Sequence, residues 1–172
     1  MTTVLVTGPI GGGKSTACRY LASLGWPVYD CDSRCKALYD TVPGLKSRIE
    51  HELGIPFTEL GRIFTEPRLR EKLEAIVYPL LLEDIEGWKA SLDSSLAFIE
   101  SAVALDKPLF DSTYDKVLMI TAPAGVRALR NPNAQERGAL QKFPRARINR
   151  TICNDSTPEA LHRKIDNYLK KI

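Results

Sequence analysis

Eight residues, Gly8 to Ser15, could bind the phosphates of a nucleotide. They read GPIGGGKS and fit the pattern of a glycine, four residues, then glycine, lysine and serine or threonine. They follow a short apolar run, 4–6, where a strand is expected to give way to a helix. Glycines bring backbone N–H groups against a polyphosphate, and a helix starting at about Lys14 adds the positive end of its dipole. The stretch therefore predicts a nucleoside triphosphate site.

The side chains of this stretch have separate expected roles. Lys14 is long enough to reach the β- and γ-phosphates, and the Ser15 hydroxyl is placed to bind Mg²⁺. The alternative is a glycine-rich turn that matches the pattern by chance. The residues expected to contact the nucleotide are Gly8, Pro9, Ile10, Gly11, Gly12, Gly13, Lys14, Ser15 and Thr16.

Two carboxylates, Asp30 and Asp32, follow the next apolar segment, 26–29, which we expect to be a second strand. In open α/β sheets ligands bind beyond the carboxyl ends of the strands, so both side chains should face the phosphate-binding stretch. The sequence thus places two acidic groups beside the predicted nucleotide site. For Asp32 the alternative role is a helix N-cap, which can coexist with a chemical one.

The rest of the chain alternates strands and helices. The alternation predicts an α/β fold with three layers, α/β/α, and a five-stranded parallel sheet like that of P-loop NTPases and nucleoside-monophosphate kinases. The expected strands are 3–7, 26–29, 96–99, 116–121 and 151–154. We expect a single domain over 1–172, with a core of 1–31, 94–130 and 148–172, a helical acceptor-substrate region at about 32–93 and a short lid at about 131–147.

Proline and threonine positions predict helix boundaries inside the helical region. Thr65, followed by Pro67, indicates a helix start with Thr65 as its cap. Pro79 should break or kink that helix, and a second amphipathic helix should continue to about Leu92. Earlier helices are expected at 32–40 and 43–53, with a helical turn at 59–64.

Composition and charge exclude several classes of protein. The apolar fraction of 44% is ordinary for a soluble globular protein, and a net charge of +3 is too weak to indicate a nucleic-acid partner. The N-terminal apolar run has the length of a strand and no other run approaches a membrane span, so we expect neither signal peptide nor membrane segment. Four cysteines without a disulfide framework or a zinc-like pair favour reduced thiols and a cytoplasmic protein.

Five stretches carry a more specific pattern than the glycine motif alone. They are TGPIGGGKST at 7–16, LGWPVYDCD at 24–32, LEAIVYP at 73–79, IESA at 99–102 and ICND at 152–155. In the same order, these resemble the TGGIGSGKST, LGxxVxDAD, LxxIxHP, ESA and VIxND motifs of the dephospho-coenzyme A kinase family. Arg137 and Gln141 also keep the R-three-Q spacing of its lid. The chain is identified as a divergent member of this family with a shortened lid.

The resemblance implies transfer of the γ-phosphate of ATP to the ribose 3′-hydroxyl of dephospho-coenzyme A, the last step of coenzyme A biosynthesis, with Mg²⁺ as cofactor. It makes Asp32 the group that orients the hydroxyl and accepts its proton, with Lys14 and Arg137 as further catalytic residues. Asp30 would serve the metal through water, or hold Lys14 or a loop amide. Arg130 is a second candidate for phosphate contact, although either arginine could be a solvated surface charge. The expected partners are the two substrates, with the protein a monomer or small homo-oligomer.

Three departures from the family pattern leave two other functions open. Pro9 replaces a glycine and removes a backbone donor, Tyr78 replaces a histidine, and the segment 131–136 is several residues short. One alternative is another small-molecule or nucleotide kinase of the same architecture. The other is a catalytically weakened relative that binds nucleotide without turnover.

Overall fold

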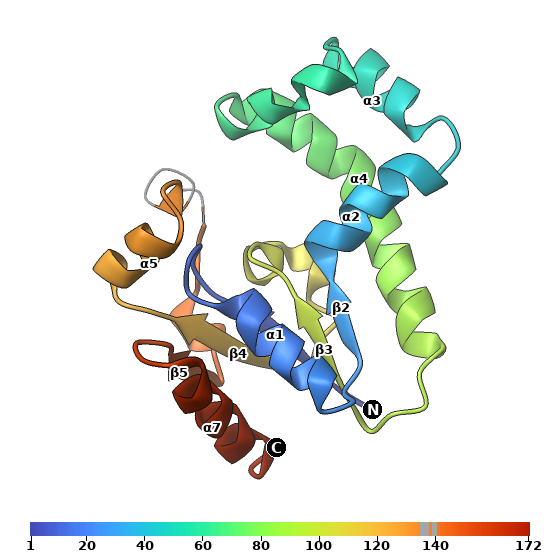
Figure 1. Ribbon diagram of the computed structural model, residues 1–172. Coiled ribbons are helices and arrows are strands. Elements are labelled where there is room, and N and C mark those ends of the chain that lie inside the picture. The colour runs from blue at the N-terminus through green and yellow to red at the C-terminus, as the bar shows by residue number, and fades with distance from the viewer. Residues whose placement is uncertain (135–137, 139–140) are drawn as a thin grey trace. The chain divides into compact units, whose positions relative to one another are not determined.

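The computed structural model describes residues 1–134, 138 and 141–172 of the 172-residue chain. It divides the chain into two compact units (Figure 1). The first unit consists of Met1–Asp30 and Leu92–Ile172, and the second of Cys31–Ser91. The predicted lid lies partly outside the described residues. In the described part of the chain, no helix is long and apolar enough to cross a membrane, and none of the four cysteines forms a disulfide.

The first unit is built on a parallel sheet, as predicted. Its five described strands lie in the order β2-β3-β1-β4-β5, so β1 is central and β5 is at an edge. The elements of this unit are β1 (Thr2–Thr7), α1 (Lys14–Ser23), β2 (Val28–Asp30), β3 (Leu96–Glu100), η2 (Ala104–Asp106), η3 (Pro108–Phe110), β4 (Lys116–Thr121), α5 (Ala124–Arg130), η4 (Arg145–Arg147), β5 (Arg150–Cys153) and α7 (Pro158–Leu169). Because all four pairings are parallel, the carboxyl ends of β1, β2 and β3 are neighbours.

Buried side chains hold α1 and α7 against one face of this sheet. Val6 of β1 packs in the same cluster as Leu21 of α1 and Ile165 of α7, and all three are fully buried. Leu5 points to the opposite face by strand alternation and is equally buried, as expected for a strand covered on both sides. Burying each such side chain contributes about 2 kcal/mol. This packing fixes the direction in which α1 leaves the glycine-rich loop.

The second unit is helical, and its longest helix joins the others. α4 (Pro67–Ala90) contacts α2 (Cys31–Thr41), α3 (Leu45–Leu53) and the 3₁₀ segment η1 (Phe57–Phe64). The buried residues of α4 recur at helical spacing and form one apolar face: Leu73, Ile76, Val77, Leu81 and Ile85. Arg34 of α2 also donates to both carboxylate oxygens of Asp84 in α4, at 2.8 and 2.5 Å.

Two predicted helix boundaries are wrong. α4 continues through Pro79, where a break or a kink was expected, so the helix does not break there. A proline removes one backbone donor, but buried side chains before and after Pro79 keep both halves of α4 in one packed helix. The cap of α4 is Glu66 rather than Thr65. The Thr65 hydroxyl instead donates to the carbonyl of Arg62 at 3.1 Å, which closes η1.

Candidate active site

The loop between β1 and α1 packs closely against the elements around it, and this packing requires its glycines. Gly8, Gly11 and Gly13 have φ angles of 141°, 77° and 103°, a region that favours glycine. A Cβ on Gly8 would lie 2.0 Å from the carbonyl oxygen of Ile120 in β4. A Cβ on Gly13 would lie 2.1 Å from the amide nitrogen of Asn154. The glycines therefore allow the loop to fit its own protein as well as to approach a phosphate.

The first turn of α1 presents a lysine that is held over the loop. Nζ of Lys14 donates to the carbonyl of Gly8 at 2.8 Å and to that of Pro9 at 3.4 Å. Phosphate oxygens carry negative charge, so they are stronger partners for an ammonium than these neutral carbonyls. Thr16, which was expected to contact the nucleotide, accepts a hydrogen bond from Arg19 at 3.3 Å.

Ser15 contacts a buried carboxylate that sequence reasoning did not include in the site. The Ser15 hydroxyl donates to Oε1 of Glu100 at 2.7 Å. Glu100 is the last residue of β3 and is only 9% exposed. Burial raises the pKa of Glu100, and the negative charge of Asp30 raises it further. The hydrogen bond from Ser15 and the charge of Lys14 act in the opposite direction.

Asp30 lies beside Glu100 at the carboxyl end of the neighbouring strand. The two residues are partners in the parallel register of β2 and β3. Such partners point to the same face of a sheet, and this is the α1 face because Glu100 is also paired with Val6 of β1. The signal that could have found Glu100 was in the sequence: an apolar strand that ends in an acid, as the second strand ends in Asp30.

These oxygen atoms fit a hard divalent cation. Ser15 offers a hydroxyl, and Asp30 and Glu100 offer carboxylates, which are the donors that Mg²⁺ prefers. Among the described residues, no group of three His, Cys, Asp or Glu side chains could hold a metal alone. Mg²⁺ usually takes one or two carboxylates from the protein and completes its shell with substrate phosphates and water. Burial and the charge of Asp30 both raise the pKa of Glu100, and a bound cation would oppose this by stabilising the ionised carboxylate.

Two further side chains reach the loop from residues after β4. Arg130, at the end of α5, donates to the carbonyl of Gly11 at 3.3 Å. Gln141 accepts a hydrogen bond from the N–H of Ile10 at 3.1 Å. Arg130 thus brings a positive charge to the rim of the loop. Arg137, expected to reach over the phosphates, lies outside the described residues.

Asn154 is a second residue of the site that sequence reasoning did not select. It follows β5 directly and is 7% exposed. Its Nδ2 donates to the carbonyl of Gly12 at 3.1 Å, and its backbone N–H donates to the carbonyl of Thr121 at 2.6 Å. Asn154 therefore holds the glycine loop to the end of β4. Its place in the ICND stretch was visible, but its contact with a loop 142 residues away was not.

Asp32 and Tyr78 belong to the second unit. Asp32 lies in the first turn of α2, where a negative charge interacts favourably with the positive end of the helix dipole. Tyr78, at the position of the family's histidine, lies in α4. Burial raises the pKa of Tyr78, and nearby Glu74 acts in the same direction. Tyr78 therefore remains a neutral phenol at physiological pH, whereas a histidine could titrate there.

Comparison with known proteins gives a consistent family. Residues 2–143 match the family model described as dephospho-CoA kinase. The dephospho-CoA kinase of Porphyromonas gingivalis (strain ATCC BAA-308 / W83) is 35% identical over 136 residues, which cover 74% of this chain and 67% of that protein.

Two solved structures share the fold over nearly the whole chain. The crystal structure of TT1252 from Thermus thermophilus has a TM-score of 0.80 and 25% identity, and covers 99% of this chain and 97% of that one. Dephospho-CoA kinase from Campylobacter jejuni has a TM-score of 0.65 and 18% identity, with coverage of 98% and 96%. The match over residues 2–143 includes the glycine loop and the acids that end β2 and β3. The chain belongs to the dephospho-CoA kinase family.

Proposed function

We propose that this chain transfers the γ-phosphoryl group of ATP to the ribose 3′-hydroxyl of dephospho-coenzyme A, giving coenzyme A and ADP. The observation that carries the proposal is the group of Lys14, Ser15 and Glu100 around a glycine loop, in a member of the dephospho-CoA kinase family. Phosphoryl transfer depends mainly on aligning the two substrates and neutralising charge on the phosphates. The loop and its neighbours are suited to both tasks.

We assign ATP to the glycine loop. Its backbone N–H groups and the N-terminus of α1 supply positive potential where the phosphates would lie. Lys14 would leave the carbonyls of Gly8 and Pro9 and bind the β- and γ-phosphates. Arg130 would add charge at the rim, and Arg137 is proposed to reach over the phosphates from the lid.

Ser15, Asp30 and Glu100 are the residues that we expect to hold Mg²⁺, directly or through water. When bound, the ion would neutralise charge on the β- and γ-phosphates. The acidic pair would keep the cation at the carboxyl ends of β2 and β3, beside the start of α1. A nearby cation would also lower the pKa of Glu100, because it favours the ionised carboxylate.

We assign Asp32 the task of orienting the acceptor hydroxyl and accepting its proton. Only two peptide bonds separate Asp32 from Asp30 at the end of β2, so the chain itself ties Asp32 to the edge of the sheet where ligands bind. A positioned base of this kind contributes about 10²-fold or more to the rate. The alternative role of Asp32 as a helix N-cap is wrong, because α2 already begins at Cys31 and Asp32 lies inside its first turn.

A nucleotide-binding protein without turnover is the second candidate, and the loop itself favours it. Pro9 has no N–H, and the N–H of Ile10 is donated to Gln141. Two of the amides that could bind a phosphate are therefore absent or occupied. Release of Gln141 on ATP binding would restore one of them.

The experiment is a coupled assay of ADP release with ATP, Mg²⁺ and dephospho-coenzyme A. AMP, GMP and shikimate serve as alternative acceptors. Turnover with dephospho-coenzyme A alone would support the proposal, and turnover with another acceptor would support a different kinase. Tight ATP binding with no turnover on any acceptor would support the second candidate.

The role of Asp32 is tested in the same assay. Asp32→Asn should lower kcat by about 10²-fold or more, with little change in ATP affinity. Asp40→Asn is the matched control, because Asp40 lies on the same helix and its side chain is 70% exposed in an ion pair with Lys46. An equal loss of activity in both variants would contradict a chemical role for Asp32.

A further inference from the structure

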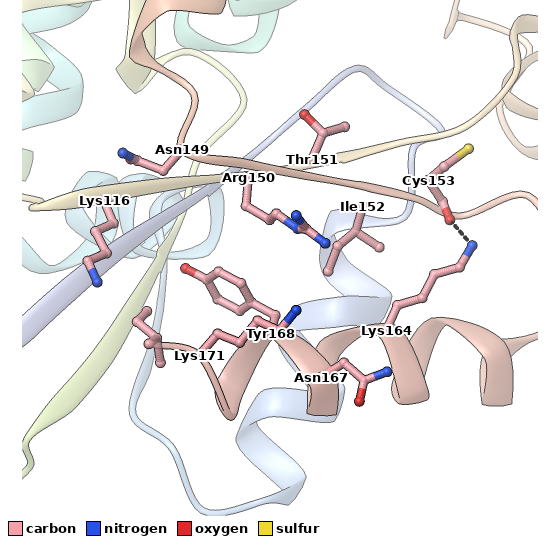
Figure 2. A pocket seen from close by; sticks show the side chains of 11 residues that line it. Lys116, Asn149, Arg150, Thr151, Ile152, Cys153, Lys164, Asn167, Tyr168 and Lys171 are labelled. Carbon is pink, nitrogen blue, oxygen red and sulfur yellow. Dashed lines mark hydrogen bonds between the residues drawn. The ribbon is translucent and has the colours of Figure 1, made fainter.

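A groove of about 600 Å³ runs along β5 and α7 in the first unit (Figure 2). Its lining includes Lys116 at the start of β4, Arg150 and Ile152 in β5, and Tyr168 and Lys171 at the end of α7. None of the described residues assigned to the nucleotide and metal sites lines it. Pockets for small ligands commonly have volumes of about 300–1,000 Å³. The groove is large enough for a small ligand and separate from the glycine loop.

Three basic side chains of the groove have no acidic partner in the part of the chain that the structure describes. The side chains of Lys116, Arg150 and Lys171 make no ion pair or hydrogen bond with any described residue. The remaining lysine, Lys164, donates to a β5 carbonyl at 2.6 Å and to Asp155 at 3.0 Å. No aspartate or glutamate appears among the described lining residues. Three cationic side chains therefore share one concave surface, and no acidic side chain of the described lining compensates their mutual repulsion.

The groove also contains a buried hydroxyl that lacks a described hydrogen-bond partner. The hydroxyl of Tyr168 is buried and has no hydrogen-bond partner among the described residues. Burial raises the pKa of Tyr168 to about 12, so at neutral pH the group is a phenol that can donate. The side-chain oxygen of Asn149 already accepts from the N–H of Val117 at 2.7 Å. Figure 2 shows Tyr168, Arg150 and Lys171 on the same side of β5.

We propose that this groove is a second anion site, and that it binds a small phosphate-bearing molecule through Lys116, Arg150, Lys171 and the Tyr168 hydroxyl. A phosphate group supplies negative charge, which no side chain of the described lining carries, and several oxygens that can accept from these donors. Arginine can bind two of those oxygens at once, and lysine adds point charges. The phenol would donate to another oxygen after a small rotation toward the groove. This proposal does not depend on the reaction proposed above.

The test is a titration of the full chain with sodium pyrophosphate, followed by ¹H–¹⁵N NMR. Pyrophosphate should also bind the glycine loop, so the position of the shifting amides is the readout. Saturable shifts at 150–153 and 168–172, in addition to those at 8–16, are expected. Shifts confined to 8–16 would overturn the proposal.

Substitutions distinguish a specific binding site from a general effect of surface charge. The triple variant Lys116→Gln, Arg150→Gln, Lys171→Gln should weaken pyrophosphate binding in the groove by about tenfold or more. The matched control is the triple variant Arg145→Gln, Arg163→Gln, Lys170→Gln, because it also removes three positive charges, from exposed residues that do not line the groove. Its binding should be unchanged. Equal weakening by both variants would mean that only the overall charge matters and would refute the site.

A second titration, with ADP, identifies the source of the phosphate. Similar affinities for ADP and pyrophosphate in the groove would indicate recognition of the phosphate groups alone. A clearly higher affinity for ADP would indicate recognition of a nucleotide, with the base packed on apolar groups such as Ile152 or the Tyr168 ring. Both results support a phosphate site, whereas unmoved groove amides with either ligand contradict it.

Discussion

Replacement of Glu100 by glutamine should make the first unit more stable and less active. Glutamine keeps the shape of the side chain and an oxygen that can accept from Ser15, whose hydroxyl lies 2.7 Å from Oε1. It removes a negative charge that is 9% exposed and lies beside Asp30. The substitution therefore removes the burial and repulsion of a charge while keeping the hydrogen bond.

The sign of the stability change follows from the raised pKa of Glu100. Below the unfolded-state pKa, about 4.3, the carboxyl is protonated in both states and the wild type and Glu100→Gln should be equally stable. As the pH rises through the folded-state pKa, the wild type loses stability and the variant does not. We therefore expect Glu100→Gln to be the more stable protein at neutral pH.

Activity should change in the opposite direction. Loss of a carboxylate expected to hold Mg²⁺ should lower kcat/KM by about 10²-fold and raise the Mg²⁺ concentration needed for half-maximal rate. The measurements are urea unfolding at several pH values and steady-state kinetics over a range of Mg²⁺ concentrations. Glu66→Gln is a control for which the opposite change in stability is expected. The hydrogen bond from Arg62 lowers the pKa of Glu66, so the ionised carboxylate stabilises the fold at neutral pH and its removal should destabilise the protein. A Glu100→Gln protein that is less stable at neutral pH, or whose stability difference does not vary with pH, would refute the reasoning.

Three other substitutions test particular contacts, and a fourth ranks the two acids. Gly13→Ala should cost more than about 2 kcal/mol and weaken ATP binding, because its Cβ would lie 2.1 Å from a neighbouring amide nitrogen. Gly25→Ala should cost only about 1 kcal/mol in unfolding experiments, because its φ is 87° but nothing lies within 4 Å. Pro79→Ala should stabilise the second unit by about 1–2 kcal/mol in denaturant unfolding, because it restores a donor inside α4. Asp30→Asn should lower kcat less than Glu100→Gln in the same kinetic assay, because Glu100 is the direct partner of Ser15.

Local signals were sufficient to predict the fold and the loop. The GPIGGGKS pattern is a local signal for positive φ angles at Gly8 and Gly13, so it predicts the loop although the atoms packed against it come from distant residues. The strand predicted at 116–121 agrees with β4, and that predicted at 96–99 is only one residue short of β3. The break predicted at Pro79 was wrong because the apolar face of α4 outweighs one missing backbone hydrogen bond.

The carboxylate that meets Ser15 could be identified only from the order of the strands. Asp30 and Glu100 carry equivalent signals, since each ends an apolar strand of a parallel sheet. β3 lies directly beside β1, whereas β2 is one strand further away, about 4.8 Å. The loop and Ser15 continue from β1, so the acid of β3 reaches the hydroxyl, whereas the acid of β2 raises the pKa of Glu100 through its charge. This order joins residues 85 positions apart in the chain, and no local periodicity in the sequence specifies it.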